Sequence, residues 1–549
     1  MLTTEIKNKV QNLWDRLWAG GLANPITAIE QISYLLFMKR LEVFNPKTKK
    51  EFKWSTYHEY EGEKLVTQVK DKVFEYIKHE LAEKDEPFAK AMKDSVFLIN
   101  TPSLLKDAIE FIDSIYKEIE KQEKNNNQYF QDIQGDVYEY LLRHTSEAGK
   151  NGQFRTPRHI IQMMAEILDP DTDGKICDLA CGSAGFLVGA YQYIITKYSK
   201  KKVKDENGLE KGIDGTNLSN NQKNDLKKNI FYGFDVDQTM VRIGMMNMMM
   251  HGITHPNITH LDTLSTRYEK FEQEQNIDNI HNEVIIKGSV KILKTSEADK
   301  SSKNNDDSSS EKYKYILANP PFTGKINSET VSDNLDRIYP ITENKKTQKK
   351  GRQKTVQSEL LFLERMIYML EVGGRACVIV PEGLLFNSSS YHVKTRKMLM
   401  QDCDLQGVIS LPGGVFQPYT GVKTSILIFE KRKLRSDVFQ DTHVWFYEMK
   451  SDGYSLDTNR KKLKENPLPK TINNWRNRFK RNQSNRKLQH FSIPFNEIES
   501  NKFEINFNKY KKFEYEAEEY RLPKDIIEEL VVLEDEIIKS LNNLDYEKI

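Results

Sequence analysis

From about residue 150 onward, short β-branched runs alternate with stretches of helical periodicity, and this alternation limits the fold more than any other feature of the sequence. Strands that alternate with helices predict an α/β domain with a doubly wound, mainly parallel sheet. We expect this domain over residues 146–440, with polar insertions near 199–228, 294–312 and 343–354. The runs predicted as strands are Lys175–Leu179, Ile230–Asp235, Tyr313–Ala318, Arg375–Val380 and Gln406–Leu411.

The segments on either side of this domain read as helical. Residues 1–145 carry apolar side chains at helical spacing, which predicts an all-α N-terminal domain. Past residue 440 the alternation fades, and 441–549 is predicted as a helical C-terminal region with a basic, aromatic stretch over 460–481. Its last helix is opened by Pro523. The heptad-like apolar spacing of that helix suits docking on a partner as well as packing on its own domain.

Charge and cysteine content exclude several classes of protein. The 82 Lys and Arg residues are balanced by 80 Asp and Glu, so a chain coated in positive charge is excluded and nucleic-acid contacts must come from local clusters. Four cysteines exclude a disulfide scaffold and favour a reducing compartment. The sequence shows no secretory leader and no run approaching the ~20 apolar residues of a membrane span, so we expect a soluble intracellular protein.

A glycine-bearing turn, within Asp178–Leu187, follows the first predicted strand and opens a helix. Such a turn lets a ligand approach the backbone at the carboxyl end of a strand. It is not the dinucleotide fingerprint, because only Gly182 and Gly185 are present and an aspartate ends the strand. Asp178 suits a cationic group, such as the amino group of a methionine moiety.

Two further aspartates follow the next predicted strands. Asp235 ends a strand, where an acidic side chain typically binds ribose hydroxyls, and Asp237 is the competing candidate just beyond it. Asp262 follows the third strand, where it is placed to read an adenine amino group or to lie in a solvated loop. These positions predict a nucleoside-binding edge of the sheet.

Asn319-Pro320-Pro321-Phe322 comes directly after the strand ending at Ala318. The prolines fix the backbone and remove two N–H donors, leaving the Asn319 side-chain oxygen and the Pro320 carbonyl as rigid acceptors. Methylation of an exocyclic amine needs such acceptors, because binding both amine hydrogens frees a lone pair that is otherwise delocalised into the ring. Phe322 adds a flat apolar face for a base, a contact worth roughly 1–3 kcal/mol.

Asp178–Leu187 and Asn319–Phe322 resemble the cofactor and catalytic motifs of S-adenosyl-methionine-dependent N6-adenine DNA methyltransferases, with Gly152–Arg158 resembling the segment that precedes the cofactor motif. Their order is that of the gamma group. The N-terminal domain further resembles the modification subunit of type I restriction–modification systems. Leu22–Leu41 carries this resemblance within the domain, and Gly373–Arg375 with Pro381–Gly383 and Leu411–Phe416 share it further along the chain. The resemblance implies a Rossmann-like, seven-stranded-type methyltransferase sheet.

The resemblance also implies the site, the cofactor and the partners. The cofactor is S-adenosyl-L-methionine, and the target adenine is held by Asn319, Pro320, Pro321 and Phe322. Ala184 stands where many relatives have glycine. The partners implied are double-stranded DNA, a separate specificity subunit, an ATP-dependent restriction subunit and a second copy of this chain, in the prokaryotic cytosol. The cofactor-binding residues are Gln153, Phe154, Arg155, Thr156, Pro157, Arg158, Asp178, Gly182, Ser183, Ala184, Gly185, Asp235 and Asp262.

A basic run after the catalytic motif is the candidate contact for DNA phosphates, which would be sensitive to salt and indifferent to sequence. No metal is expected, because the His251, His255 and His260 group lacks acidic or cysteine partners at ligand spacing. Three alternatives stay open: a methyltransferase for RNA or protein glutamine, a self-contained DNA adenine methyltransferase, and a catalytically silent scaffold. The basic run comprises Lys345, Lys346, Lys349, Lys350, Arg352 and Lys354.

Overall fold

The computed structural model divides into two compact units, Met1–Tyr510 and Lys511–Ile549. The second unit contributes one described element, the helix α19 (Pro523–Asn542). The described residues are 3–81, 86–126, 135, 137–138, 140–141, 156–212, 214–274, 312–322, 324–343, 350–433, 442–479, 484–513 and 523–542.

The N-terminal part is helical, as the periodicity predicts. Thr3 caps the first helix by accepting a hydrogen bond from the Ile6 amide at 3.3 Å, and Asn24 caps the second, where Pro25 occupies the first turn. The helices are α1 (Thr4–Ala19), α2 (Pro25–Phe44), η1 (Lys50–Phe52), α3 (Trp54–Tyr57), α4 (Gly62–Val66), η2 (Thr67–Phe74), η3 (Ile77–Leu81), α5 (Glu86–Met92) and α6 (Pro102–Asn126).

A nine-stranded sheet in the order β15-β14-β12-β13-β11-β6-β1-β4-β5 forms the centre of the first unit. It is mainly parallel, and β13 and β15 run antiparallel to their neighbours. Strand order reverses between β1 and β6, which is where α/β folds bind ligands. The strands are β1 (Ile176–Asp178), β4 (Phe231–Asp235), β5 (Asn257–His260), β6 (Tyr313–Ala318), β11 (Leu370–Pro381), β12 (Cys403–Ser410), β13 (Thr424–Lys431), β14 (His443–Glu448) and β15 (His490–Pro494).

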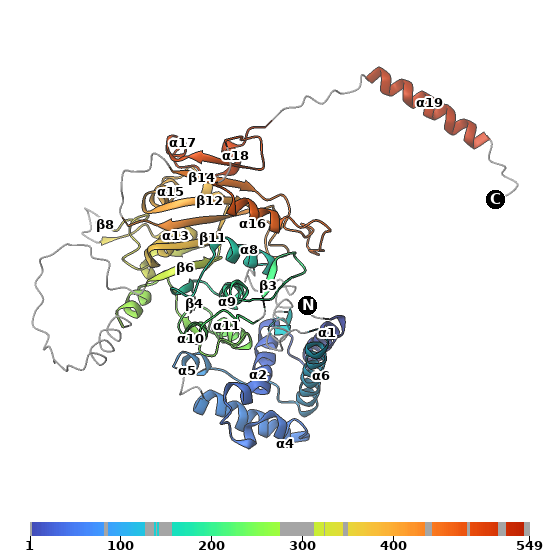
Figure 1. The fold of residues 1–549 in the computed structure, drawn as a ribbon, viewed down its shortest axis with the longest axis vertical. Coiled ribbons are helices and arrows are strands. Elements are labelled where there is room, and N and C mark those ends of the chain that lie inside the picture. The colour runs from blue at the N-terminus through green and yellow to red at the C-terminus, as the bar shows by residue number, and fades with distance from the viewer. Residues whose placement is uncertain are drawn as a thin grey trace, which may run out of the picture. The chain divides into compact units, whose positions relative to one another are not determined.

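Helices cover both faces of the sheet, so the predicted doubly wound α/β fold is confirmed (Figure 1). Alternate residues of β6 enter different cores: Tyr315 and Leu317 pack with one set of helices, and Ile316 and Ala318 with the other. The first core also contains the N-terminal helices. Its sheet-covering helices are α8 (Arg158–Leu168), α9 (Gly185–Lys197), α10 (Asn220–Lys228), α11 (Gln238–Met250) and α16 (Leu468–Arg476); the second core has α13 (Ser358–Met369), α14 (Gly383–Phe386), α15 (Ser390–Asp402), α17 (Phe495–Ser500) and α18 (Phe507–Tyr510).

The sheet continues past residue 440, where the sequence pattern predicts a boundary. β14 pairs with β12, and β15 pairs with β14, so both extend the same sheet. The sequence pattern did not predict these strands, because long polar loops surround them. Val444, Trp445 and Phe446 of β14 are nevertheless buried. The described residues of the insertion at 199–228 form β2, β3 and α10. The remaining short elements are β2 (Lys202–Lys204), β3 (Glu210–Gly212), β7 (Lys325–Asn327), η5 (Ser328–Thr330), β8 (Thr342–Glu343), β9 (Lys350–Gly351) and β10 (Thr355–Gln357).

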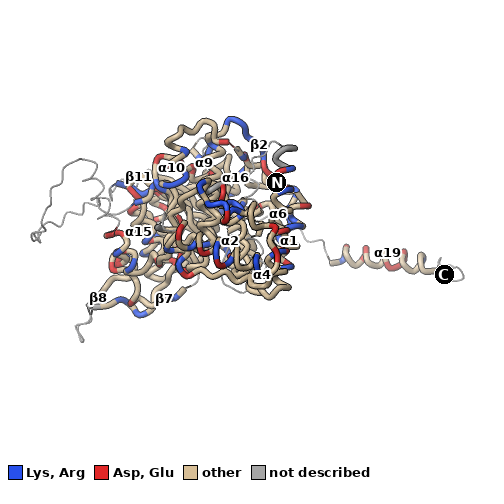
Figure 2. Tube along the Cα trace, turned by 90° about the horizontal axis from the view of Figure 1, so that it is seen from below, with Lys and Arg blue, Asp and Glu red and all other residues tan. Residues whose placement is uncertain are grey.

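Basic and acidic residues are interspersed along the first unit (Figure 2). This agrees with a chain whose net charge is only +2. None of the helices in the described part of the chain has the length and apolar character needed to cross a bilayer. None of the residues described for α19 is buried.

Candidate active site

A cavity of about 370 Å³ lies at the carboxyl ends of β1, β4 and β6, where strand order reverses. This volume is within the range of small-molecule sites. The cavity brings together most of the predicted cofactor and catalytic residues. Its lining residues are Thr156, Ile161, Asp178, Leu179, Ala180, Cys181, Gly182, Ser183, Gly185, Phe186, Asp235, Val236, Asp237, Met240, Ile243, Leu261, Asp262, Thr263, Asn319, Pro320, Pro321 and Phe362.

Asp178 ends β1 as a buried carboxyl group with 1% of its surface exposed. Burial, with a smaller contribution from the negative charge of Asp235, raises the pKa of Asp178 to about 8 against the hydrogen bond from the Ala180 amide. That amide donates to Asp178 Oδ1 at 3.2 Å. A buried carboxyl group with this pKa favours a positively charged ligand, because a cation replaces the solvation that the carboxylate has lost.

The backbone of the glycine turn after β1 enters the left-handed region at two residues. Gly182 has φ +51° and Ala184 has φ +62°, and Ala184 is the N-cap of α9. A Cβ atom at Gly244 of α11 would lie 2.9 Å from the Gly182 carbonyl oxygen, so α11 packs directly against the turn. Asn247 of α11 also donates from Nδ2 to the Ser183 carbonyl at 2.8 Å. Ala184 is fully buried and does not line the cavity.

Asp235 joins the end of β4 to this turn. Its Oδ2 accepts a hydrogen bond from the Gly182 amide at 2.8 Å, and its Oδ1 accepts one from the Asp237 amide at 2.9 Å. Burial raises the pKa of the Asp235 carboxyl group. The competing candidate, Asp237, caps α11 through the Thr239 and Met240 amides. Asp235 therefore holds the turn after β1 and the start of α11 in place through one backbone amide of each.

Asp262 follows β5 and lines the cavity. Its Oδ1 accepts a hydrogen bond from the Leu264 amide at 2.9 Å. The loop is fixed further by Thr263, whose hydroxyl donates to the Leu179 carbonyl at 3.3 Å. The loops after β1 and β5 are thus bonded to each other beneath the cavity.

Asn319 follows β6 and presents a buried acceptor. Its Nδ2 donates to Thr156 Oγ1 at 2.9 Å, which holds the amide in one orientation. Its Oδ1 is buried, and no donor within the described part of the chain reaches it. A buried acceptor without a partner costs about 1–3 kcal/mol. A ligand that donates a hydrogen bond at this point recovers that cost.

Phe322 does not line the cavity. Its ring is 7% exposed and packs edge-to-face on Phe416, with centroids 6.0 Å apart. Phe362 of α13 lines the cavity and was missed by the sequence analysis, because it looks like any apolar position on a buried helix face. The assignment of Phe322 to base stacking stays a prediction.

Several predicted residues lie elsewhere. Pro157 is the N-cap of α8, and Arg158 begins that helix, donating to Gln192 Oε1 at 3.4 Å outside the cavity. Gln153, Phe154 and Arg155 are outside the described residues, as are Lys345, Lys346 and Lys349, and only the backbone of Lys350 is described.

The sequence predicts that Arg352 and Lys354 face DNA. Lys354 is exposed, but Arg352 is not available for such a contact. The Arg352 side chain is only 3% exposed. Its guanidinium donates to the backbone carbonyls of Val331, Ser332, Asp333 and Tyr339 at 2.7–3.1 Å. Arg352 therefore closes a loop rather than offering its charge to a phosphate.

Two family models and several curated proteins match this chain. The family described as N-6 DNA Methylase matches residues 129–519, and the HsdM N-terminal domain matches residues 6–144. The EcoEI methylase subunit of a type I restriction enzyme from Escherichia coli is 26% identical over 83% of this chain and 80% of its own. The EcoKI methylase subunit from E. coli K12 is 24% identical over 82% and 72%.

Solved structures share the fold. A chain from a study of assembly and conformational transition in the type I R-M system matches 98% of this chain and 97% of its own, with 21% identity and a TM-score of 0.58. A modification subunit of a putative type I restriction enzyme from Vibrio vulnificus YJ016 matches 91% and 94%, with 18% identity and a TM-score of 0.58.

Proposed function

The chain belongs to the N-6 DNA methylase family, and we propose that it is the modification subunit of a type I restriction–modification enzyme that methylates N6 of adenine in DNA. The observation that carries the chemistry is the buried, unpartnered side-chain oxygen of Asn319 on the wall of an acidic cavity. The match of residues 6–144 to the HsdM N-terminal domain supports the subunit assignment.

The residues after β6 perform the part of the reaction that concerns the base. Asn319 Oδ1 accepts one N6 hydrogen, and the Pro320 carbonyl accepts the other, so that the nitrogen lone pair leaves the ring system. The amine is thereby prepared to accept a methyl group, and the proton that it would give up on methylation would pass to water. In duplex DNA the adenine must first leave the base stack, at a cost of a few kcal/mol. S-adenosyl-methionine, when bound, supplies the methyl group on a sulfonium.

The acidic residues fit that cofactor. We assign Asp178 to its α-ammonium group, Asp235 to its ribose hydroxyls and Asp262 to its adenine amino group. Asp178 supports the assignment, because a buried carboxyl group with a pKa of about 8 is stabilised by a cation. Gly182 and Gly185 carry no side chain, so the backbone of the turn itself lines the cavity at these positions.

We expect the affinity for S-adenosyl-methionine to fall as the pH drops below about 8. The folded-state pKa of Asp178 is about 8, so at lower pH this carboxyl group is neutral and must release a proton to pair with a cation. The loss approaches about tenfold per pH unit. Isothermal titration between pH 6 and 9, in buffers of different ionisation enthalpy, measures both the affinity and the released proton.

The Asp178→Asn variant is the control, because the α-amino group of the ligand also titrates near pH 8. This variant should bind weakly and lose the proton release. Without ligand, the parent should lose stability relative to this variant as the pH rises from about 4 to about 8, because the Asp178 carboxyl group ionises first in the unfolded chain; above pH 8 the full penalty is present. A parent affinity that follows only the titration of the ligand would contradict the role of Asp178.

We further propose that α19 binds the specificity subunit. Its apolar residues Ile526, Leu530, Leu533, Ile537 and Leu541 are 44–58% exposed and follow the three- and four-residue spacing of a coiled-coil stripe. The helix also carries six acidic residues and two lysines, which favours a partner helix flanked by basic residues. DNA, the restriction subunit and a second copy of this chain complete the proposed complex, in the prokaryotic cytosol.

Truncation after residue 522 tests this proposal. Because Met1–Tyr510 is a compact unit by itself, the truncated chain should fold and bind S-adenosyl-methionine normally. It should lose co-purification with the specificity subunit and at least about 100-fold in site-specific methylation, since target recognition depends on that partner. A matched control replaces only the two exposed lysines of α19, Lys524→Gln and Lys539→Gln, which leaves the apolar stripe and the acidic residues intact and should retain the complex. Normal assembly of the truncated chain would contradict the role of α19.

The function is tested by methyl incorporation with and without the specificity subunit. We expect N6-methyladenine in duplex DNA only when both chains are present. Robust, sequence-specific methylation by the lone chain would favour a self-contained methyltransferase. Incorporation into RNA or protein glutamine, and none into DNA, would replace the proposal.

A further inference from the structure

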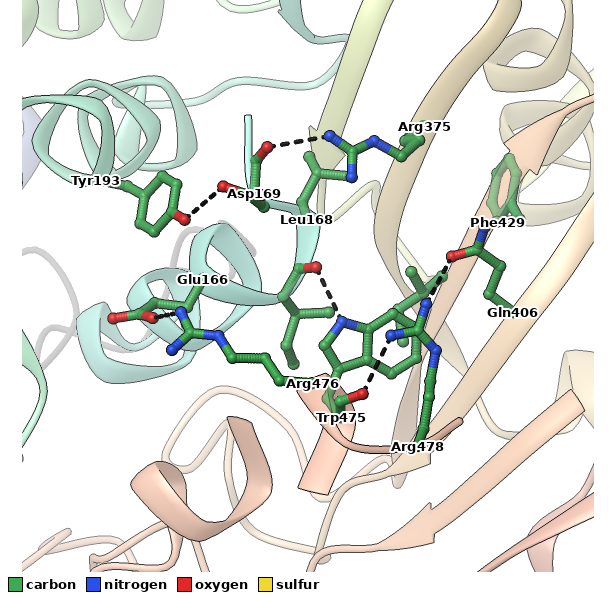
Figure 3. A pocket seen from close by; sticks show the side chains of 12 residues that line it. Glu166, Leu168, Asp169, Tyr193, Arg375, Gln406, Phe429, Trp475, Arg476 and Arg478 are labelled. Atoms are coloured by element: carbon green, nitrogen blue, oxygen red, sulfur yellow. Dashed lines mark hydrogen bonds and ion pairs between the residues drawn. The ribbon is translucent and has the colours of Figure 1, made fainter. Parts of the chain in front are cut away.

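A second cavity, of about 460 Å³, lies toward the amino ends of the sheet strands and shares no residue with the proposed cofactor cavity. The end of α8, the helix α9, the strands β11 to β13 and the segment from Trp475 to Arg478 form its walls (Figure 3). Its lining residues are Glu166, Ile167, Leu168, Asp169, Tyr193, Arg375, Gln406, Ile428, Phe429, Trp475, Arg476 and Arg478.

Two arginines face this cavity with neutral partners. Arg375 donates from Nη2 to the Asp169 carbonyl at 3.0 Å. Arg478 donates to the Trp475 carbonyl at 3.1 Å and to Gln406 Oε1 at 3.3 Å, while its Nε is buried without an acceptor in the described residues. Among the described residues, neither guanidinium lies within 4.0 Å of a carboxylate oxygen.

The acidic residues of the same cavity are already neutralised. Glu166 forms an ion pair with Arg476. Asp169 accepts hydrogen bonds from Lys197 Nζ at 2.7 Å and from the Tyr193 hydroxyl at 2.6 Å. Lys197 also pairs with Asp171 at 2.8 Å, and the carboxylate of Asp404 attracts Arg478 from outside the cavity lining. Among the residues that line the cavity, Arg375 and Arg478 are bonded only to neutral acceptors. Glu430, which faces Arg375 across β11 and β13, makes no ion pair with it among the described contacts.

The charges are also held in position. The guanidinium of Arg478 lies 3.6 Å from the Trp475 ring centroid, and the Trp475 indole donates to the Ile167 carbonyl at 3.1 Å. That bond, together with the bond from Arg375 to the Asp169 carbonyl, satisfies carbonyls at the end of α8, where the helix dipole is negative. Burial, with a smaller contribution from the positive charge of Arg375, lowers the pKa of Arg478 to about 10 against the attraction of the Asp404 carboxylate. The arginines therefore repel each other across a preformed site.

We propose that this second cavity binds a phosphate group through Arg375 and Arg478. A phosphate accepts several charge-assisted hydrogen bonds at once, and the planar fork of arginine matches its oxygens. An anion placed between the two guanidiniums removes their repulsion and provides an acceptor for Arg478 Nε. The phosphate comes either from a free nucleotide or inorganic phosphate, or from the DNA backbone.

The first arm of the test uses inorganic pyrophosphate and the full-length chain. Pyrophosphate should bind with a Kd below about 1 mM and raise the Tm above that in sodium chloride of equal ionic strength, since a ligand of the folded state stabilises it. The Arg375→Gln and Arg478→Gln variants should each weaken binding at least about tenfold, as expected when a charged contact of about 1.4 kcal/mol is lost. Arg486→Gln, whose guanidinium is paired with Glu497 at 2.6 Å outside the cavity, should bind like the parent.

The second arm distinguishes the sources and alone depends on the proposed function. Duplex binding by the chain and its specificity subunit is measured as a function of salt. If the ligand is backbone phosphate, each variant reduces the slope of log K against log salt by about one, and pyrophosphate competes with DNA. If the ligand is free, the slopes stay unchanged while pyrophosphate binding is lost. A parent chain that neither binds pyrophosphate nor is stabilised by it, with unchanged slopes in both variants, would overturn the proposal whatever its methylation activity.

Discussion

Replacing Asn319 with alanine is expected to lower the methylation rate by at least about 100-fold while the affinity for S-adenosyl-methionine stays within about twofold of the parent. Loss of one preorganised hydrogen-bonding group at a reacting centre costs about 10²–10³ in kcat. Asn319 offers the target amine its buried Oδ1, whereas the proposed cofactor contacts come from Asp178 and Asp235. Single-turnover methyl transfer and equilibrium cofactor binding separate the two effects.

Two variants sharpen this result. Thr156→Val removes the acceptor that orients the Asn319 amide through the 2.9 Å bond to Nδ2, so it should reduce the rate by about tenfold, less than loss of Asn319 itself. Asn327→Ala alters an exposed asparagine that caps a short helix through the Glu329 amide at 3.2 Å, and the rate should stay near that of the parent. Equal losses of rate and cofactor affinity in Asn319→Ala would instead place Asn319 in the cofactor site.

The part of the site that could be predicted from the sequence consists of residues at strand ends. Asp178, Asp235 and Asn319 each close a short apolar run, and parallel strands bring their carboxyl ends to one edge. Short-range patterns therefore suffice for them. Phe362 lies on a buried helix face, and its position in the cavity depends on how α13 packs on the sheet. Sequence periodicity marks such a residue as core and carries no information about which cavity it borders.

The elements that escaped prediction depend on partners far along the chain. Trp445 and Phe446 read as an isolated aromatic run, and they form a strand because β12 offers them a free edge. Arg352 looks like one more charge in a basic run, yet carbonyls 13–21 residues away enclose its guanidinium. Arg375 and Arg478 meet across a cavity although about a hundred residues separate them. These arrangements arise from tertiary packing, which local spacing does not record.

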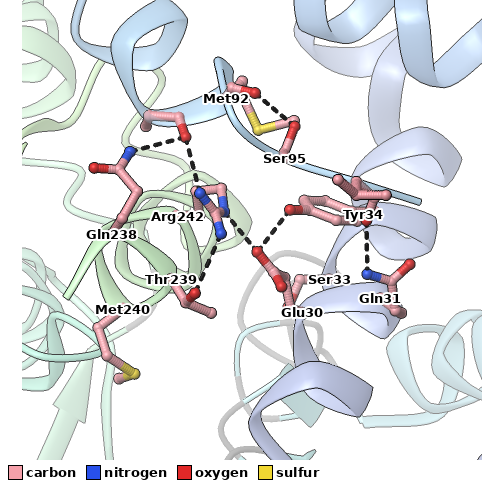
Figure 4. Close-up of polar contacts among 12 residues, drawn as sticks. Glu30, Gln31, Ser33, Tyr34, Met92, Ser95, Gln238, Thr239, Met240 and Arg242 are labelled. Atoms are coloured by element: carbon pink, nitrogen blue, oxygen red, sulfur yellow. Dashed lines mark hydrogen bonds and ion pairs between the residues drawn. The ribbon is translucent and has the colours of Figure 1, made fainter. Parts of the chain in front are cut away.

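Removal of the Glu30 carboxylate is expected to destabilise the chain by about 3–5 kcal/mol, because Arg242 is then left as an uncompensated buried charge. Arg242 Nε lies 2.5 Å from Glu30 Oε1, and their side chains are only 8% and 12% exposed (Figure 4). The Tyr34 hydroxyl donates to the same carboxylate oxygen at 2.8 Å. The Glu30→Ala variant should show this loss in urea-induced unfolding.

The same pair joins the N-terminal helices to the wall of the proposed cofactor cavity. Glu30 lies on α2 and Arg242 on α11, which packs on the turn at Gly182 and bonds to the Ser183 carbonyl. Loosening α11 should therefore weaken S-adenosyl-methionine binding as well as stability, although neither residue lines the cavity. Cofactor affinity measured at temperatures where the variant is folded separates this positional effect from unfolding.

The double variant Glu30→Leu with Arg242→Met decides between a charge effect and a packing effect. Apolar replacement of a whole buried pair is often neutral or stabilising, so the double variant should be markedly more stable than Glu30→Ala. The exposed pair Glu5–Lys9, whose side chains are 57% and 27% exposed, is the matched control, and Glu5→Ala should cost less than about 1 kcal/mol. A Glu30→Ala variant as stable as Glu5→Ala would show that water reaches Arg242 and that the pair does not fix α11 to the N-terminal helices.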